Sequence, residues 1–195
     1  MKRISKVNRK TKETDITIFL NIDGTGKYNI RTPVQFMNHM LELFAMHGLF
    51  DLRIAANGDV NVDDHHTVED VGILLGQAFK KALDKRIGIR RYGNAVVPMD
   101  ESLVQVSVDI SGRSWLAYNI NSKAKRIKNF DTGLCEDFWI AFVNNAGMTV
   151  HLNEIYGRNT HHVLEATFKG MGMALGIAAS VDIRRKRIPS TKGTI

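Results

Sequence analysis

The sequence predicts an α+β fold made of two similar halves, each a sheet with its helices. Several segments alternate apolar and polar residues, which is typical of strands, and longer segments repeat apolar residues with helical periodicity. A histidine-rich helix start also occurs twice, 96 residues apart. We expect one repeat over residues 1–90 and a second over 91–195, joined at the charged segment Gly88–Tyr92. Each half is too small to bury a good core alone, so the halves should form one compact unit.

Composition narrows the class of protein. Of the 195 residues, 44% are hydrophobic and the net charge is +7, which is typical of a basic globular chain. The single cysteine, Cys135, excludes an intrachain disulfide, and no membrane span or signal peptide is evident, so we expect a cytoplasmic protein. Both ends are basic, which suits nucleic acid, a phosphorylated substrate or simply a solvated terminus.

The first half shows strand, helix, strand and helix patterns in turn. Thr14–Asp23 alternates as a strand, and Asp23-Gly24 is typical of a hairpin turn into a returning strand over Tyr28–Thr32. A helix is expected from Pro33 to near Gly48. Asp51–Asp63 alternates again, and the first histidine-rich helix follows.

The second half repeats this order. We expect, in sequence, a strand at Leu103–Ile110, a turn at Ser111-Gly112-Arg113, a partner strand at Trp115–Ile120, a helix at Asp131–Asn145, a strand at Met148–Ile155 and a helix that ends near Val181. Gly170, Gly172 and Gly176 in that last helix predict close helix packing.

The repeated motif predicts metal ligands. His65-His66 with Glu69 matches His161-His162 with Glu165 at the same spacing. A histidine and a glutamate four residues on share one face of a helix. Adjacent histidines point about 100° apart, so each pair suits two ions better than one. Imidazole with carboxylate suits Mn, Fe, Zn or Ni.

The duplication extends the ligand set. His39 lies on the helix before the lone strand of the first half, and Asp137 or its neighbour Glu136 holds the matching place in the second. We favour Asp137 and predict eight ligands for two ions: His39, His65, His66, Glu69, Asp137, His161, His162 and Glu165. About four protein ligands for each ion leave open positions, which mark a catalytic site.

Cationic residues at turns suggest a phosphate clamp. The candidates are Arg91, Arg113, Lys169 and Lys192, and the segment Pro189–Gly193 adds hydroxyl and amide groups on a possible lid. His47 ends a helix and could touch substrate.

Together these motifs resemble the imidazoleglycerol-phosphate dehydratases of histidine biosynthesis. The resemblance rests on these segments: Lys12-Glu13-Thr14, Asp23-Gly24-Thr25-Gly26, Asn38-His39-Met40-Leu41, Asp63 to Asp70, Ser111-Gly112-Arg113, Asn159 to His162 with Glu165 to Lys169, and Pro189 to Gly193. The resemblance implies two Mn²⁺ ions per active site and a homo-oligomer of 24 subunits built from trimers, with active sites between subunits. It places the eight residues above at metal positions. It places substrate contacts at Glu13, Arg91, Arg113, Lys169, Ser190 and Lys192, and we add His39 and His47. Thr32-Pro33-Val34-Gln35 departs from the family pattern, and Asp137 stands where many relatives have histidine.

The implied reaction is dehydration of imidazole glycerol phosphate to imidazole acetol phosphate, through an imidazolate and a diazafulvene. Candidate catalytic residues are Glu13, Glu165 and His65, and a metal-bound water is another possible proton carrier. Two other classes stay open. A nucleic-acid-binding protein should show stacking aromatics among its basic residues, and the basic tails contain none. A dimetal hydrolase would not form a keto phosphate.

Overall fold

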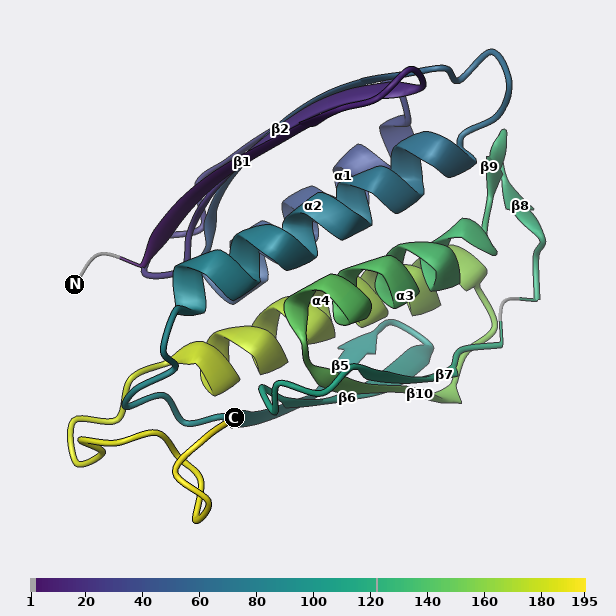
Figure 1. Cartoon of the computed structure of the whole chain (residues 1–195). Coiled ribbons are helices and arrows are strands. Elements are labelled where there is room, and N and C mark those ends of the chain that lie inside the picture. The colour runs from purple at the N-terminus through teal and green to yellow at the C-terminus, as the bar shows by residue number, and fades with distance from the viewer. Residues whose placement is uncertain (1–2, 122) are drawn as a thin grey trace.

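Two sheets enclose two layers of helices. The computed structural model describes residues 3–121 and 123–195. Within those residues, four α-helices lie between two four-stranded sheets, one sheet on each outer side (Figure 1). The predicted α+β fold of two similar sheet-and-helix halves is confirmed. In the described part of the chain, no helix is long and apolar enough to cross a membrane.

The elements follow the same order in both halves. The first half contains β1 (Ile4–Lys10), β2 (Thr14–Asn21), β3 (Tyr28–Arg31), α1 (Gln35–Gly48), β4 (Asp51–Gly58) and α2 (His65–Leu83). The second contains β5 (Tyr92–Met99), β6 (Ser102–Asp109), β7 (Trp115–Asn119), α3 (Leu134–Ala146), β10 (Thr149–Tyr156) and α4 (Thr160–Ala179). A short ribbon, β8 (Arg126–Ile127) with β9 (Phe130–Asp131), is inserted before α3.

The strand order corrects two sequence predictions. The sheets run β1-β2-β4-β3 and β5-β6-β10-β7, so β4 and β10 separate the strands that we expected to pair as hairpins. β3 and β7 lie parallel to β4 and β10, and α1 and α3 make the crossovers. Asp23-Gly24 begins a loop instead of a hairpin, because the Asp51 carboxylate at the start of β4 accepts hydrogen bonds from Thr25 N (2.8 Å) and Lys27 N (3.2 Å).

Two further segments differ from their predicted structure. The predicted strand at Asp51–Asp63 ends at Gly58, and the following residues form the loop into α2. The basic N-terminal segment, which we considered a solvated terminus, is the edge strand β1, and Ser5 on its inner face donates to Ala78 O of α2 (2.8 Å). Charged residues on an edge strand discourage pairing with other chains.

The helix layers join the halves through one core. Side chains from both halves meet edge to face, as in Phe44–Trp139 (6.1 Å) and Phe79–Phe142 (5.6 Å). Two glycines allow the helices to approach closely: a Cβ on Gly76 of α2 would overlap Phe142 O of α3, and a Cβ on Gly172 of α4 would overlap Phe44 O of α1. Gly176 also faces α1, as predicted, whereas Gly170 faces Val106 of the sheet.

Candidate active site

The histidine motifs sit at the starts of α2 and α4, where corresponding side chains accept hydrogen bonds from the first histidine of each motif. Asp63 Oδ1 accepts from His65 N (2.9 Å), and Asn159 Oδ1 accepts from His161 N (3.0 Å). Asp63 and Asn159 share the 96-residue offset of the histidines themselves. Because these hydrogen bonds fix both helix starts, the imidazoles emerge from corresponding places in the two halves.

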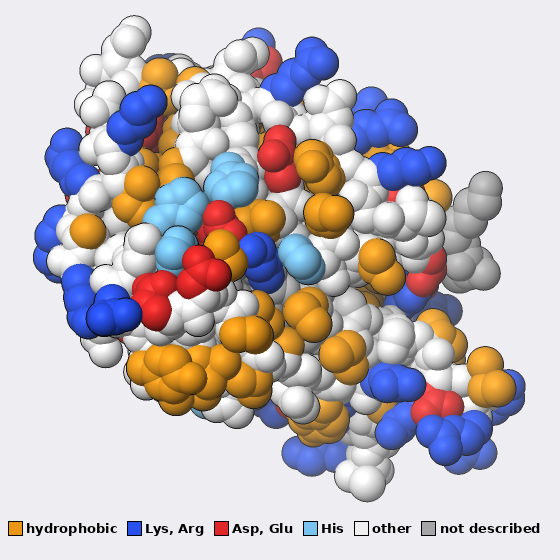
Figure 2. Space-filling view, turned by 180° about the vertical axis from the view of Figure 1, so that it is seen from behind, with side chains coloured by type: hydrophobic (Ala, Val, Ile, Leu, Met, Phe, Trp, Pro, Cys, Tyr) orange, Lys and Arg blue, Asp and Glu red, His pale blue; other side chains and the backbone are white. Residues whose placement is uncertain are grey.

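Three predicted ligands converge at one point. His39 Nε2 from α1 and His161 Nε2 from α4 each lie 3.0 Å from the same oxygen, Glu165 Oε1. Their ligand atoms all lie within 4.8 Å of one another, close enough to hold one ion. Lys169 Nζ donates to the other oxygen, Oε2 (2.7 Å). Figure 2 shows imidazole and carboxylate side chains gathered on this face. We call His39, His161 and Glu165 the first cluster.

The charge on Glu165 is strongly stabilised. Burial alone would raise the pKa of this carboxyl, but hydrogen bonds from Lys169, His39 and His161 outweigh burial and lower the pKa to about 2. At neutral pH the side chain is therefore an anion with little tendency to take up a proton. This suits a metal ligand better than a general base.

A second group surrounds His65. Its Nδ1 lies 3.5 Å from Asp137 Oδ2, and its Nε2 lies 3.7 Å from Glu69 Oε2. The two carboxylates thus face different nitrogens of one ring and do not converge on one point. All three side chains are 42–47% exposed, so this second group is open to solvent. Asp137, and not Glu136, lies beside His65; Glu136 is exposed and lines a separate pocket with Tyr118.

Both groups cross the halves. His39 of the first half joins His161 and Glu165 of the second, and Asp137 of the second half joins His65 and Glu69 of the first. Helix packing creates this exchange, because the close contacts at Gly76 and Gly172 place α2 against α3 and α1 against α4.

His66 and His162 point away from these groups. Their rings lie 6.1 and 6.3 Å from those of His65 and His161, at interplanar angles of 76° and 82°. His66 Nδ1 lies 3.1 Å from Asp59 Oδ2, and His162 Nδ1 lies 2.8 Å from Glu101 Oε2. These carboxylates raise the pKa of both imidazoles. The chain therefore has two groups built from predicted ligands alone, whereas His162 lies in a further cluster with Asp100 and Glu101, whose ligand atoms are within 4.8 Å of one another.

The predicted phosphate contacts divide between the ends of the molecule. Lys169 lies at the first cluster. The pKa of His47 is lowered, mainly by desolvation and second by the positive charge of Lys169. Arg91 instead lies at the far end of α4, where its N donates to Ala178 O (2.9 Å). Ala178 is about 25 Å along the helix from His161, at 1.5 Å per residue.

Arg91 is engaged in structural contacts. Its guanidinium binds Asp109 (Nε–Oδ1 2.7 Å) and donates to Pro189 O (3.0 Å), which ties down the segment that contains Ser190 and Lys192. Arg113 is exposed in the turn after β6, next to the C-terminus of α3, since Gly112 N donates to Gly147 O (2.9 Å). Within the chain, the structure does not bring Arg91, Arg113, Ser190 and Lys192 to the first cluster.

Comparison with known proteins decides the family. The family model described as "Imidazoleglycerol-phosphate dehydratase" matches residues 32–175. The chain belongs to the imidazoleglycerol-phosphate dehydratase family. A dehydratase of this name from Thermoanaerobacter sp. is 55% identical over 193 residues, covering 99% of this chain and 100% of the relative. Another, from Prochlorococcus marinus subsp. pastoris, is 53% identical over 194 residues, covering 99% and 96%.

Solved dehydratase structures share the fold. The crystal structure from Staphylococcus aureus is 41% identical, with a TM-score of 0.84 over 92% of this chain and 99% of that chain. The enzyme from Pyrococcus furiosus in complex with (S)-C348 is 38% identical, with a TM-score of 0.84 over 97% and 100%. The family consists of hydro-lyases, so this chain is an enzyme.

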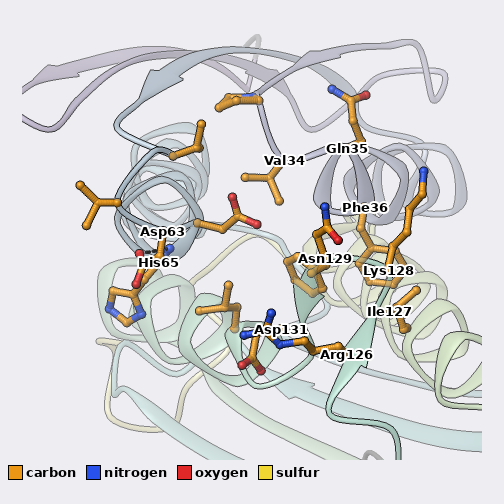
Figure 3. A pocket seen from close by; sticks show the side chains of 16 residues that line it. Val34, Gln35, Phe36, Asp63, His65, Arg126, Ile127, Lys128, Asn129 and Asp131 are labelled. Atoms are coloured by element: carbon orange, nitrogen blue, oxygen red, sulfur yellow. Dashed lines mark hydrogen bonds between the residues drawn. The ribbon is translucent and has the colours of Figure 1, made fainter.

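A cavity lies beside the second group. It has a volume of about 750 Å³ and is bounded by the approach to α1, the start of α2 and the β8–β9 ribbon (Figure 3). Val34 and Gln35, within the segment that departs from the family pattern, line it together with Asp63 and His65. The departure therefore changes the wall of a space that opens next to a predicted ligand.

Sequence reasoning missed two carboxylates of this dehydratase. Asp59 and Glu101 hold His66 and His162, yet neither was among the candidates. For Glu101 a signal was present: Glu101-Ser102 repeats Glu13-Thr14 after 88 residues. For Asp59 we find no such signal, because its counterpart in the second half is Arg158.

Proposed function

We propose that this protein dehydrates imidazole glycerol phosphate to imidazole acetol phosphate and water in L-histidine biosynthesis. Family membership supports the reaction, and the convergence of His39, His161 and Glu165 is the observation that carries the chemistry. A cytoplasmic location remains a prediction from the cysteine count and the biosynthetic family.

Two divalent ions, preferably Mn²⁺, would complete the site. Imidazole nitrogens with carboxylate oxygens suit this ion, and the first cluster already offers three such atoms within 4.8 Å. His65, Glu69 and Asp137 offer three more, although their side chains must turn to converge. When bound, the ions would supply Lewis acidity toward the imidazole ring of the substrate.

We further propose that each active site lies between subunits, in an assembly of 24 built from trimers. Each group has three ligands in its own subunit, and His66 and His162 point outward from it. A neighbouring subunit can therefore supply the fourth ligand. The same arrangement would bring the Arg91 end of one subunit to the histidine end of another.

The residues of the chain have separable tasks in this proposal. The phosphate would be held by Lys169, Arg91, Arg113, Ser190 and Lys192. Because the phosphate takes no part in the reaction, the free energy of binding it can be used to orient the reacting carbons of the substrate. The electron-rich ring would expel its neighbouring hydroxyl to give a diazafulvene, and proton loss from the next carbon would give an enol that becomes the ketone. We assign proton transfer to Glu13, whose side chain is exposed, because Glu165, with its low pKa, suits a ligand better than a base.

A direct assay tests the function. Metal-free protein should not turn over imidazole glycerol phosphate, and Mn²⁺ should restore formation of the keto phosphate. Release of inorganic phosphate instead would identify a dimetal hydrolase. His66→Ala and His162→Ala should each abolish activity in a folded protein, and near-normal turnover in either would contradict the dimetal site.

A further inference from the structure

We propose that Asp59 and Glu101 are positioning residues that fix His66 and His162 with Nδ1–H donated inward and Nε2 presented to a metal. We also infer that the two halves use carboxylates from different positions for this task. Glu101 holds His162 in the second half, whereas Asp59 holds His66 in the first, which leaves Glu13, the counterpart of Glu101, free for the substrate. This inference rests on the proposed function and names a further role within the same site.

The contact in the second half is firmly built. Glu101 Oε2 accepts from His162 Nδ1 at 2.8 Å. Its other oxygen, Oε1, accepts from Asn159 N (2.8 Å) and from Ser102 Oγ (3.0 Å). The backbone of the helix start therefore fixes the carboxylate, and the carboxylate fixes the ring.

The remaining ring nitrogen of His162 agrees with this tautomer. Asn159 Nδ2 makes a long contact to His162 Nε2 (3.4 Å), in which Nε2 is the acceptor. A neutral imidazole that donates through Nδ1 carries its lone pair on Nε2. That lone pair is the one a metal would use.

The first half reaches the same result with a different residue. Asp59 Oδ1 and Oδ2 lie 3.2 and 3.1 Å from His66 Nδ1. Asp59 follows β4, and its N donates to Glu13 O (3.1 Å), so Glu13 lies on the adjoining turn. The backbone of Glu13 thus holds Asp59 in place, whereas Asp59 holds the histidine.

The duplication shows that these roles were exchanged. Glu13 corresponds to Glu101, because β2 and β6 match at an offset of 88 residues. Asp59 corresponds to Arg158, because a bulge between Glu154 and Tyr156 shifts the match of β4 and β10 from 98 to 99 residues. Gly58 and Gly157 confirm this match, because a Cβ on either would overlap the corresponding helix residue, Thr67 or Val163. The second half therefore has a cation in the place of Asp59, and Glu101 supplies the carboxylate.

Glu13 is therefore relieved of the task that Glu101 performs. Its side chain is exposed, and in residues 3–121 and 123–195 its carboxylate makes no hydrogen bond. A carboxylate beside His66 that holds no imidazole can act on the substrate.

The carboxylate–histidine contact affects metal binding in a known way. A carboxylate that accepts from one ring nitrogen fixes the tautomer and orientation of a metal-binding histidine, and it increases the basicity of the other nitrogen. Loss of such a partner typically weakens metal binding about 10- to 100-fold. Because the effect is on affinity, excess metal should restore occupancy.

The test compares the corresponding pair Glu101 and Glu13. Mn²⁺ is titrated into metal-free Glu101→Ala, Glu101→Gln, Glu13→Ala and wild-type protein, and turnover is measured at low and saturating Mn²⁺. Asp100→Ala is the matched comparison. This carboxylate is 74% exposed and 3.9 Å from His162 Nδ1, and it lies in one cluster with Glu101 and His162, so wild-type Mn²⁺ affinity in this variant would exclude Asp100 as a direct ligand. It has the same charge without the hydrogen bond.

We expect Glu101→Ala to raise the Mn²⁺ Kd by about 10- to 100-fold and to recover most of its kcat at saturating Mn²⁺. Glu101→Gln, which still accepts a hydrogen bond, should lose less, and Asp100→Ala should match wild type. Glu13→Ala should bind Mn²⁺ normally and lose kcat at any metal concentration. Asp59→Asn should resemble Glu101→Gln.

Three results would overturn the inference. Glu101→Ala with wild-type Mn²⁺ affinity would remove the positioning role. A Glu101→Gln loss as large as that of His162→Ala would make Glu101 a direct ligand. Weakened Mn²⁺ binding in Glu13→Ala would contradict the exchange. Failure of the proposed function looks different, because then wild-type protein itself would form no keto phosphate at any Mn²⁺ concentration.

Discussion

Asp137 occupies the position where the ligand chemistry of the two halves differs. The last residues of α1 and α3, Gly48 and Ala146, match at an offset of 98 residues, which places Asp137 opposite His39 and leaves Glu136 without a counterpart among the candidate ligands. The structure agrees in placing Asp137 Oδ2 at 3.5 Å from His65 Nδ1. A hard oxygen donor here should favour Mn²⁺ over softer ions.

We therefore predict that Asp137→Ala lowers Mn²⁺ occupancy from two sites to one and cuts turnover strongly. Asp137→His should retain much of both, with selectivity shifted toward Zn²⁺ or Ni²⁺. Metal titration with elemental analysis measures this, and Glu136→Ala is the control. A loss in Glu136→Ala with none in Asp137→Ala would mean that the ligand had been assigned to the wrong neighbour.

The sequence predicts the candidate ligands, but it does not predict how the structure groups them. The repeated motif identified the histidines because it depends only on spacing within a helix. That His39 joins His161, across the halves, follows from helix packing between residues more than 100 positions apart. Nor does the sequence show that Arg91 pairs with Asp109 at the other end of the molecule.

At the level of elements, helices were predicted better than strands. The four helices were confirmed to within a few residues, because each has a long apolar stripe. β5 was missed because its inward residues are Gly93, Ala95 and Val97, and the small first two give little periodicity. The reason for their size is the close approach of α4: a Cβ on Gly93 would overlap Ala174 O.

The helix contacts predict a stability effect. Gly76→Ala and Gly172→Ala should each lower the free energy of unfolding by about 1–3 kcal/mol, since overpacking outweighs the roughly 1 kcal/mol gained from alanine's helix propensity. Gly133→Ala is the control, because φ is −61° there and its Cβ would meet only Asp131 Oδ1, at 3.3 Å. Denaturant unfolding measures all three, and equal stability would show that the helices can separate at little cost.

At the scale of the whole molecule, metal removal should affect assembly. If His66 and His162 serve neighbouring subunits, each bound ion stabilises the contact by linkage. Chelation should then reduce the particle size on a sizing column, and Mn²⁺ should restore it. An unchanged elution volume after verified metal removal would count against ligands shared between subunits.

The separation of histidines and cations predicts complementation between two inactive variants. His162→Ala lacks a metal ligand at one end of the subunit, and Arg113→Ala lacks a phosphate contact at the other. If each active site takes these residues from different subunits, co-expression in equal amounts should leave both intact in about a quarter of the sites of a mixed homo-oligomer. Activity should therefore return to about that fraction of wild type, whereas separately purified variants, mixed without reassembly, should stay inactive. If one subunit supplied both residues, every site would carry one defect and co-expression would restore nothing.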